Sequence, residues 1–237
     1  MICAHGARGG SAAARAHAEA IGRHGVFASV HACALFGTPG LEETLVGLAG
    51  RAVLLLPFLM ADGYTARRVL PRRLAEAGIA PTVRPPLGTH PGLASVIAAA
   101  ARAHGAGRES ALLLIGHGSG RDPASTGTAR AHAARLAASG AFAAVATAFL
   151  DAPPGIAEAL AGLGARPVVA VGLFADAGTH GDDDAPRRLA AARPDALYAG
   201  AIGPRPEIAD LILAHATGAP WPATQAAEPP VAPCRTL

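Results

Sequence analysis

The sequence predicts an α/β protein of two tandem lobes, each with a four-stranded parallel sheet and helices on both faces. Two observations support this prediction. Short apolar runs alternate with helix-like stretches along the chain, which is typical of βα units in a parallel sheet. The first half of the chain also recurs in the second half at a constant shift, so that one βα frame is used twice.

In the first half, strand-like and helix-like stretches alternate in chain order. The predicted strands are residues 1–4, 27–35, 52–58 and 82–87, and the predicted helices are residues 11–24, 41–49, 66–77 and 92–104, with Pro71 interrupting the third helix. In the second half, residues 112–115 form an apolar run bounded by glycine, which predicts a strand buried on both faces, and a helix follows at 124–139.

The duplication is defined by matched segments. Ala14-Arg-Ala-His-Ala18 reappears as Ala129-Arg-Ala-His-Ala133, and Pro71-Arg-Arg-Leu74 reappears as Pro186-Arg-Arg-Leu189, both at a shift of 115 residues. A constant shift through prolines and glycines is harder to obtain by chance than matches between alanines. We therefore predict an N-terminal lobe at 1–106, a C-terminal lobe at 107–219, and an irregular tail rich in proline and alanine at 220–237.

Composition narrows the classes of function. The net charge of +3 is carried by arginine, which suits carboxylate or phosphate groups on a ligand, and no basic patch interleaved with aromatic residues indicates nucleic acid. Cys3, Cys33 and Cys234 form no CxxC pair, so we expect a reducing cytoplasm rather than a disulfide framework or a zinc ribbon. The chain opens with no basic-then-apolar leader, and its apolar runs are shorter than the ~20 residues of a membrane helix, so no membrane association is expected. The oligomeric state is left open.

Three polar residues follow predicted strands of the second half. His117 stands between Gly116 and Gly118 after the run 112–115, and His180 lies in a glycine-bounded loop after the run 168–174. Asp151 directly follows Ala148-Phe-Leu150. Ligands bind at the carboxyl ends of strands in open α/β sheets, and a neutral imidazole offers a lone pair to a metal or a proton. We therefore expect His117 and His180 to face each other, with Asp151 near them.

The two halves differ chemically at these positions. At the shift of 115, Phe36 takes the place of Asp151 and Thr65 takes the place of His180. His5 remains as the counterpart of His117, so the pattern predicts one equipped site per chain, with the first half contributing shape.

Simpler explanations exist for each candidate. His117 is also compatible with an ordinary loop histidine, and Asp151 with a helix N-cap or Asx turn before Pro153. Asp182–Asp184 fit the acidic first turn of the next helix better than a metal site. The other histidines, which we interpret as structural or exposed residues without clustering, are His17, His24, His31, His90, His104, His132 and His215.

Three segments resemble the small class II tetrapyrrole chelatases of the CbiX/SirB type. They are Leu-Leu-Ile-Gly-His-Gly-Ser…Arg-Asp-Pro (113–123), Ala-Phe-Leu-Asp (148–151) and Leu-Phe-Ala-Asp-Ala-Gly-Thr-His…Asp-Ala-Pro (173–186). The resemblance implies two Rossmann-like lobes with the site in the cleft between them. It also implies that His117 and His180 hold the incoming metal. Together with Asp151, they form the expected catalytic set. The family has a glutamate where Asp151 stands, and its first loop is one residue shorter.

The same resemblance implies sirohydrochlorin as the organic substrate, in cobalamin or sirohaem biosynthesis, and Co²⁺ or Fe²⁺ as the metal substrate. No organic cofactor is implied. Imidazole nitrogens suit both metals, a carboxylate can take the protons that leave the macrocycle, and arginines can orient its carboxylates. One other function stays open, that of a non-catalytic tetrapyrrole or metal carrier derived from a chelatase. A third, a periplasmic-type binding protein with two α/β lobes, is not expected without a signal peptide.

Overall fold

Two parallel four-stranded sheets form the frame of the molecule, which confirms the predicted fold class. The computed structural model describes residues 1–6, 9–120, 122 and 124–221, so most of the predicted tail, together with Arg121 and Pro123 of the 113–123 segment, lies outside the described residues. The strand order is β2-β1-β3-β4 in one sheet and β6-β5-β7-β8 in the other. The strands are β1 (Ile2–Ala4), β2 (Ala32–Ala34), β3 (Leu54–Phe58), β4 (Thr82–Val83), β5 (Ala111–Gly116), β6 (Ala144–Phe149), β7 (Val168–Gly172) and β8 (Leu197–Ala201).

The helices repeat in the same order in both halves. Those of the first half are α1 (Ala12–Gly22), α2 (Leu41–Val46), the π-helical turn η1 (Thr65–Val69), α3 (Leu70–Ala77), the 3₁₀ turn η2 (Leu87–Thr89) and α4 (Leu93–Ala103). Those of the second half are α5 (Ala124–Ala138), α6 (Ile156–Ala161), the π-helical turn η3 (Thr179–Asp184), α7 (Ala185–Ala192) and α8 (Glu207–Thr217). None of the helices in the described part of the chain is both long and apolar enough to cross a membrane.

Several predicted elements are shorter or more complex in the structure. The strand predicted over 27–35 is confined to β2, and the strand predicted over 82–87 ends at Val83. Pro85 and Pro86 explain the second difference, because proline has no N–H with which to continue a ladder. The helix predicted over 66–77 is a π-helical turn followed by α3, with Pro71 in the first turn of α3, where a missing N–H is tolerated.

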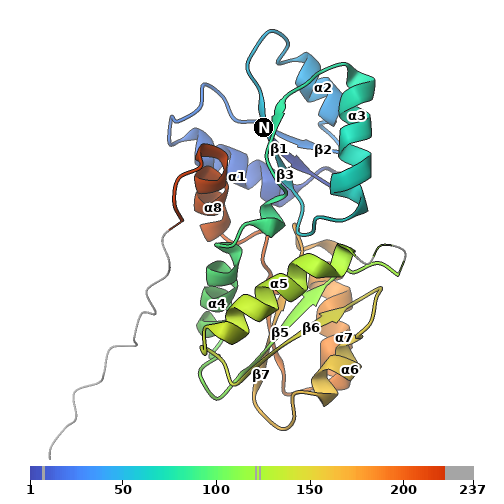
Figure 1. Cartoon of the computed structure of the whole chain (residues 1–237), viewed down its shortest axis with the longest axis vertical. Coiled ribbons are helices and arrows are strands. Elements are labelled where there is room, and N and C mark those ends of the chain that lie inside the picture. Colours follow the sequence, from blue (N-terminus) through green and yellow to red (C-terminus); the bar gives the residue numbers. More distant parts are fainter. Residues whose placement is uncertain (7–8, 121, 123, 222–237) are drawn as a thin grey trace, which may run out of the picture.

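The last helix of each half packs on the other half. Helix α4 contacts α5, β7 and β8, whereas α8 contacts α1 and β3. Figure 1 shows this exchange, with α8 beside α1 in one lobe and α4 beside α5 in the other. One apolar core cluster accordingly contains residues of both sheets, such as Phe58 and Leu114, and helix residues such as Ile97 and Ile212. The two halves of the sequence are therefore not identical with the two lobes in space, because each lobe includes the last helix of the other half.

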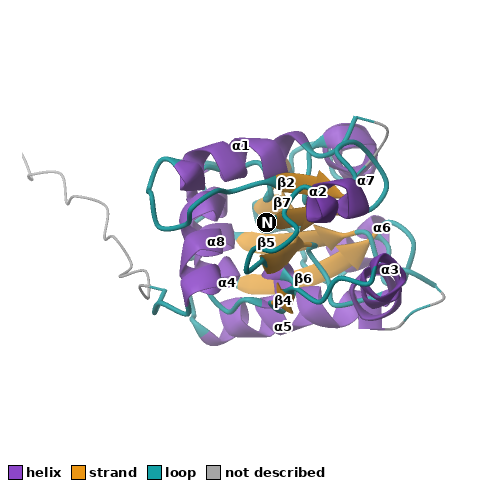
Figure 2. Ribbon diagram, turned by 90° about the horizontal axis from the view of Figure 1, so that it is seen from above, coloured by secondary structure: helices purple, strands orange, loops and turns teal. Residues whose placement is uncertain are grey.

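Two buried histidines join the lobes through equivalent hydrogen bonds. His17 on α1 donates from Nε2 to the carbonyl of Gly203 at 2.7 Å, and His132 on α5 donates from Nε2 to the carbonyl of Gly88 at 2.6 Å. Each pair is related to the other by the shift of 115. Burial lowers the pKa of both histidines, so the neutral imidazole is favoured. The interface between the lobes is therefore approximately symmetric. Figure 2, seen from above, shows helices surrounding the stacked sheets.

Candidate metal-binding site

His117 is placed by the carboxyl end of β5. Every residue of β5 is buried, whereas the side chain of His117, the next residue, is 50% exposed. Gly118 has a φ of 70°, and a Cβ there would lie 2.9 Å from the Cβ of Phe149. Because glycine alone satisfies both conditions, the chain turns sharply at this point and leaves the imidazole uncovered.

Asp151 is tied to the same loop by its backbone. The N–H of Asp151 donates to the carbonyl of His117 at 2.9 Å, and Arg188 Nη1 on α7 donates to the carbonyl of Leu150 at 2.9 Å. These bonds bring the Asp151 carboxylate to 3.4 Å from His117 Nδ1. Asp151 is therefore the neighbour of His117 that the sequence predicts.

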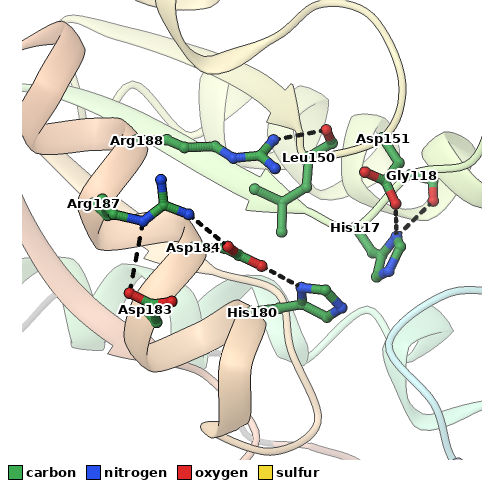
Figure 3. A network of polar contacts seen from close by, with 9 residues as sticks. All are labelled: His117, Gly118, Leu150, Asp151, His180, Asp183, Asp184, Arg187 and Arg188. Carbon is green, nitrogen blue, oxygen red and sulfur yellow. Dashed lines mark hydrogen bonds and ion pairs between the residues drawn. The ribbon is translucent and has the colours of Figure 1, made fainter.

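His180 projects from the π-helical turn η3. Its Nδ1 lies 2.9 Å from Asp184 Oδ2 at the end of that turn, and Arg187 Nη2 lies 2.9 Å from the other oxygen of Asp184 (Figure 3). The hydrogen bond with His180, assisted by Arg187, holds the pKa of the Asp184 carboxyl below its usual range despite desolvation. Asp184 is therefore ionised at neutral pH and fixes the orientation of the His180 ring. π-helical turns of this kind occur frequently at functional sites.

The two imidazoles meet at the edge of the second sheet. Their ring centroids are 4.6 Å apart and the rings are nearly perpendicular, at 80°. His117 Nδ1 faces the carbonyl of Gly118 at 3.0 Å and the Asp151 carboxylate, while His180 Nδ1 faces Asp184. All of these partners are acceptors, so both Nδ1 atoms carry the proton and both Nε2 lone pairs remain for a metal ion. The tautomers are thus assigned from the hydrogen-bond partners.

The first lobe retains the frame of this site without its ligands. His5 Nδ1 faces the carbonyl of Gly6 at 3.1 Å, as His117 faces that of Gly118. Phe36 occupies the position of Asp151, and Thr65 begins η1 where the second lobe has His180. Among the described residues, a single imidazole pair therefore lies at these two edges.

Sequence reasoning missed two features of this region. Asp184 was interpreted as a first-turn acid, although its spacing of four residues from His180 on one helical turn predicts contact. Asp183 pairs with Arg187 at 3.7 Å, so the three aspartates do not converge on one point. His90 and His215 were expected not to cluster, but their ring centroids are 5.0 Å apart because α8 packs near the end of the first half.

The fold and the paired imidazoles define a two-lobed α/β protein with two adjacent histidines at the carboxyl edge of its second sheet. The chain belongs to the CbiX family, because the family model matches residues 1–103 and 111–219. These two stretches correspond to the two halves of the duplication.

Known relatives agree with this membership. The chain is 26% identical, over 96% of its length and 94% of the relative's, to a protein of Halobacterium salinarum named probable sirohydrochlorin cobaltochelatase. Its structure resembles that of CbiX, described as the terminal enzyme for biosynthesis of siroheme in denitrifying bacteria, with 33% identity, a TM-score of 0.75, and coverage of 93% of this chain and 98% of the other.

A multi-domain protein of Deinococcus radiodurans with structural similarity to chelatases matches with 25% identity and a TM-score of 0.75. The match covers 93% of this chain, which spans only 55% of the length of that protein.

Proposed function

We propose that this protein is a sirohydrochlorin chelatase, which inserts Co²⁺ or Fe²⁺ into sirohydrochlorin in cobalamin or sirohaem biosynthesis. The observation that carries the proposal is the pair of imidazoles 4.6 Å apart, each with its Nδ1 engaged by an acceptor. Membership of the CbiX family and the names of the two relatives support the same reaction.

His117 and His180 would hold the metal ion that is about to be inserted. Neutral imidazole suits cobalt and iron, and metal–nitrogen bonds of about 2 Å are compatible with ring centroids 4.6 Å apart. The ionised Asp184 at Nδ1 makes the Nε2 atom of His180 a stronger metal ligand. Two protein ligands leave the other positions of the ion to water and then to the macrocycle, so the metal can be released.

Insertion exchanges the metal ion for two pyrrole N–H protons. Asp151 is half exposed and lies 3.4 Å from His117 Nδ1, so it can accept the first proton and release it to water, and its restored carboxylate then stabilises a protonated His117 once the metal has left. The second proton is taken by the Nε2 of His117 and then passes to water as well. Sirohydrochlorin carries many carboxylates, and all 20 basic residues other than histidine are arginines, which bind carboxylates through two parallel hydrogen bonds.

The reaction is proposed for the cytoplasm, without an organic cofactor. This part of the proposal rests on the cysteine content, in which Cys3, Cys33 and Cys234 form no CxxC pair. One relative is named for cobalt and the other for sirohaem, which contains iron, so the preferred metal is the first property to measure.

Purified protein mixed anaerobically with sirohydrochlorin and either Co²⁺ or Fe²⁺ tests the proposal. A chelatase changes the visible spectrum of the tetrapyrrole faster than the spontaneous reaction does, and His180→Ala loses this acceleration. A carrier is the second candidate, favoured by the carboxylate of Asp151, which is one methylene shorter than the family's glutamate. A carrier would bind the tetrapyrrole or the metal without accelerating insertion, and that outcome would refute the chelatase proposal.

A further inference from the structure

Two exposed aromatic side chains stand at the carboxyl edge of the first sheet. Phe36, after β2, is 49% exposed, and Tyr64, after β3, is 62% exposed. The large hydrophobic residues that are exposed in the described part of the chain are Val26, Phe36, Val46, Tyr64, Val83 and Leu197. The two aromatic residues in this set, Phe36 and Tyr64, therefore lie at one edge of the first sheet. Phe36 is at the position equivalent to Asp151, and Tyr64 precedes the position equivalent to His180.

Phe36 is held in a defined orientation. Arg73 on α3 donates to the carbonyl of Leu35, as Arg188 does to that of Leu150 in the second lobe. Glu42 anchors the Arg73 guanidinium, whose central carbon lies 5.9 Å from the centroid of the Phe36 ring. The His5 ring lies 5.0 Å from the same centroid at an angle of 47°. The ring is thus contacted by His5 and Arg73, while about half of the side chain remains exposed.

This edge borders the loops that carry the metal-binding histidines. The N–H of Asp62, in the loop after β3, donates to Thr128 Oγ1 at 3.2 Å. Thr128 lies on α5, the helix that follows the His117 loop. In the equivalent place, the N–H of Ala13 on α1, shortly after the His5 loop, donates to Asp176 Oδ1 at 2.9 Å, four residues before His180. Each lobe therefore fixes the loops of the other at the carboxyl edges of both sheets.

We infer that Phe36, contacted by His5 and Arg73 and with Tyr64 at the same edge of the sheet, is a positioning residue that binds the flat face of the tetrapyrrole macrocycle. The inference rests on the proposed function and adds a role for the first lobe. A conjugated ring with carboxylates on its rim gains from an aromatic partner at its face, whereas an aspartate at position 36 would repel those carboxylates. Phenylalanine at the position of Asp151 thus exchanges a proton acceptor for a surface that binds the substrate.

Binding of metal-free sirohydrochlorin, followed through its absorbance and fluorescence, tests this role directly. Phe36→Ala weakens binding about tenfold and raises KM for the tetrapyrrole by a similar factor, with kcat nearly unchanged. Phe36→Tyr keeps the aromatic face and restores binding, whereas Phe36→Leu keeps apolar bulk and does not. Leu197→Ala is the matched control, because Leu197 is an exposed apolar residue, 53% exposed, on β8.

Unchanged tetrapyrrole affinity and KM in a folded Phe36→Ala protein would overturn the inference. So would binding by Phe36→Leu equal to that of wild type, since apolar area alone would then suffice. The proposed function fails separately, if wild type binds sirohydrochlorin in a Phe36-dependent way without accelerating insertion. No binding of sirohydrochlorin by the wild type would overturn both.

Discussion

The two lobes share one backbone frame but differ in the chemistry that it carries. His5 and His117 make the same contact with the carbonyl of the following glycine, at 3.1 and 3.0 Å. Yet Phe36 and Thr65 stand where the second lobe has Asp151 and His180. The frame therefore places an imidazole ring at a strand end in both lobes, whereas the second imidazole and the neighbouring carboxylate stand in the second lobe.

The difference extends below the surface of the site. At the shift of 115, Val69 takes the position of Asp184 and is buried, at 7% exposure. The first lobe thus lacks the carboxylate that would orient a histidine at position 65, as well as that histidine. The equivalent edge of the first lobe therefore has neither a second histidine nor a carboxylate to contact it.

A second pair of adjacent histidine rings, His90 and His215, shows that ring proximity alone does not leave two lone pairs free for a ligand. His90 Nδ1 accepts a hydrogen bond from the N–H of Gly92, and His215 Nε2 donates to the carbonyl of Pro85. The neutral His90 must therefore carry its proton on Nε2, which leaves at most one free lone pair in this pair. In contrast, both rings of the His117–His180 pair turn a proton toward the protein and keep a lone pair for the ligand.

The largest expected effect separates His180 from its counterpart Thr65. His180→Ala lowers the rate of metal insertion at least about 100-fold, because one imidazole and one aspartate hold a borderline-soft ion poorly. The melting temperature and tetrapyrrole binding stay close to wild type, since the half-exposed ring opens no core cavity. Thr65→Ala is the control and retains insertion. Insertion by His180→Ala near the wild-type rate would remove His180 from the mechanism, and a large fall in melting temperature would instead mark it as a structural residue.

The next effect concerns the carboxylate that has become Val69 in the first lobe. Asp184→Asn keeps the shape of the side chain but removes the charge that orients the His180 Nδ1–H. Insertion or metal affinity is expected to fall about 10- to 100-fold, the range seen for outer partners of metal-binding histidines. Asp183→Asn, which alters an exposed neighbour, is the matched control. Equal activity in the Asp184→Asn and wild-type proteins would show that His180 needs no such support.

Much of this comparison could be predicted from the sequence. The apolar run before Gly116-His117-Gly118 identifies a strand end, and the shift of 115 correctly predicts two similar sheets. Together they also predict that His117 and His180 approach each other, because the carboxyl ends of β5 and β7 are adjacent. Local periodicity and glycine placement determine these features, so one sequence is sufficient.

Other features depend on tertiary contacts that periodicity does not encode. The apolar face of α4 predicts burial but does not tell which sheet buries it, so the exchange of α4 and α8 was not expected. The bonds of His17 and His132 across the lobes were missed as well, although both histidines and their partners Gly88 and Gly203 recur at the shift of 115. In a duplicated chain, a histidine and a glycine that both recur at the same shift indicate a reciprocal contact between the halves.

The two equivalent hydrogen bonds across the lobe interface should contribute similarly to stability. His17→Ala and His132→Ala are each expected to lower the free energy of unfolding by about 1–3 kcal/mol, because each leaves a glycine carbonyl without its donor. Urea unfolding of both variants measures this. A large loss in one variant and none in the other would contradict the symmetry seen in the hydrogen bonds.

The same pair predicts a pH dependence. Burial lowers the pKa of both histidines in the folded protein below the unfolded value of about 6.5. Their stabilising contribution is therefore complete above about pH 6.5 and declines as the pH falls toward the folded pKa, because the unfolded chain binds protons first. Wild type should lose more stability between pH 7.5 and 5.5 than His132→Gln does. Equal losses would show that His132 is not responsible.

The smallest expected effect is that of His5→Ala, which tests whether the first lobe has retained any metal chemistry. His5 has the local contact of His117, but its neighbour is the Phe36 ring at 5.0 Å rather than a carboxylate, and Thr65 offers no second imidazole. A single imidazole binds a metal weakly, so its removal should change kcat for insertion by less than about twofold, while His117→Ala causes a loss like that of His180→Ala. A modest increase in KM for the tetrapyrrole is expected, because His5 contacts the Phe36 ring. Comparable losses of kcat in His5→Ala and His117→Ala would show that the metal passes through both lobes and that the assignment of one site per chain is wrong.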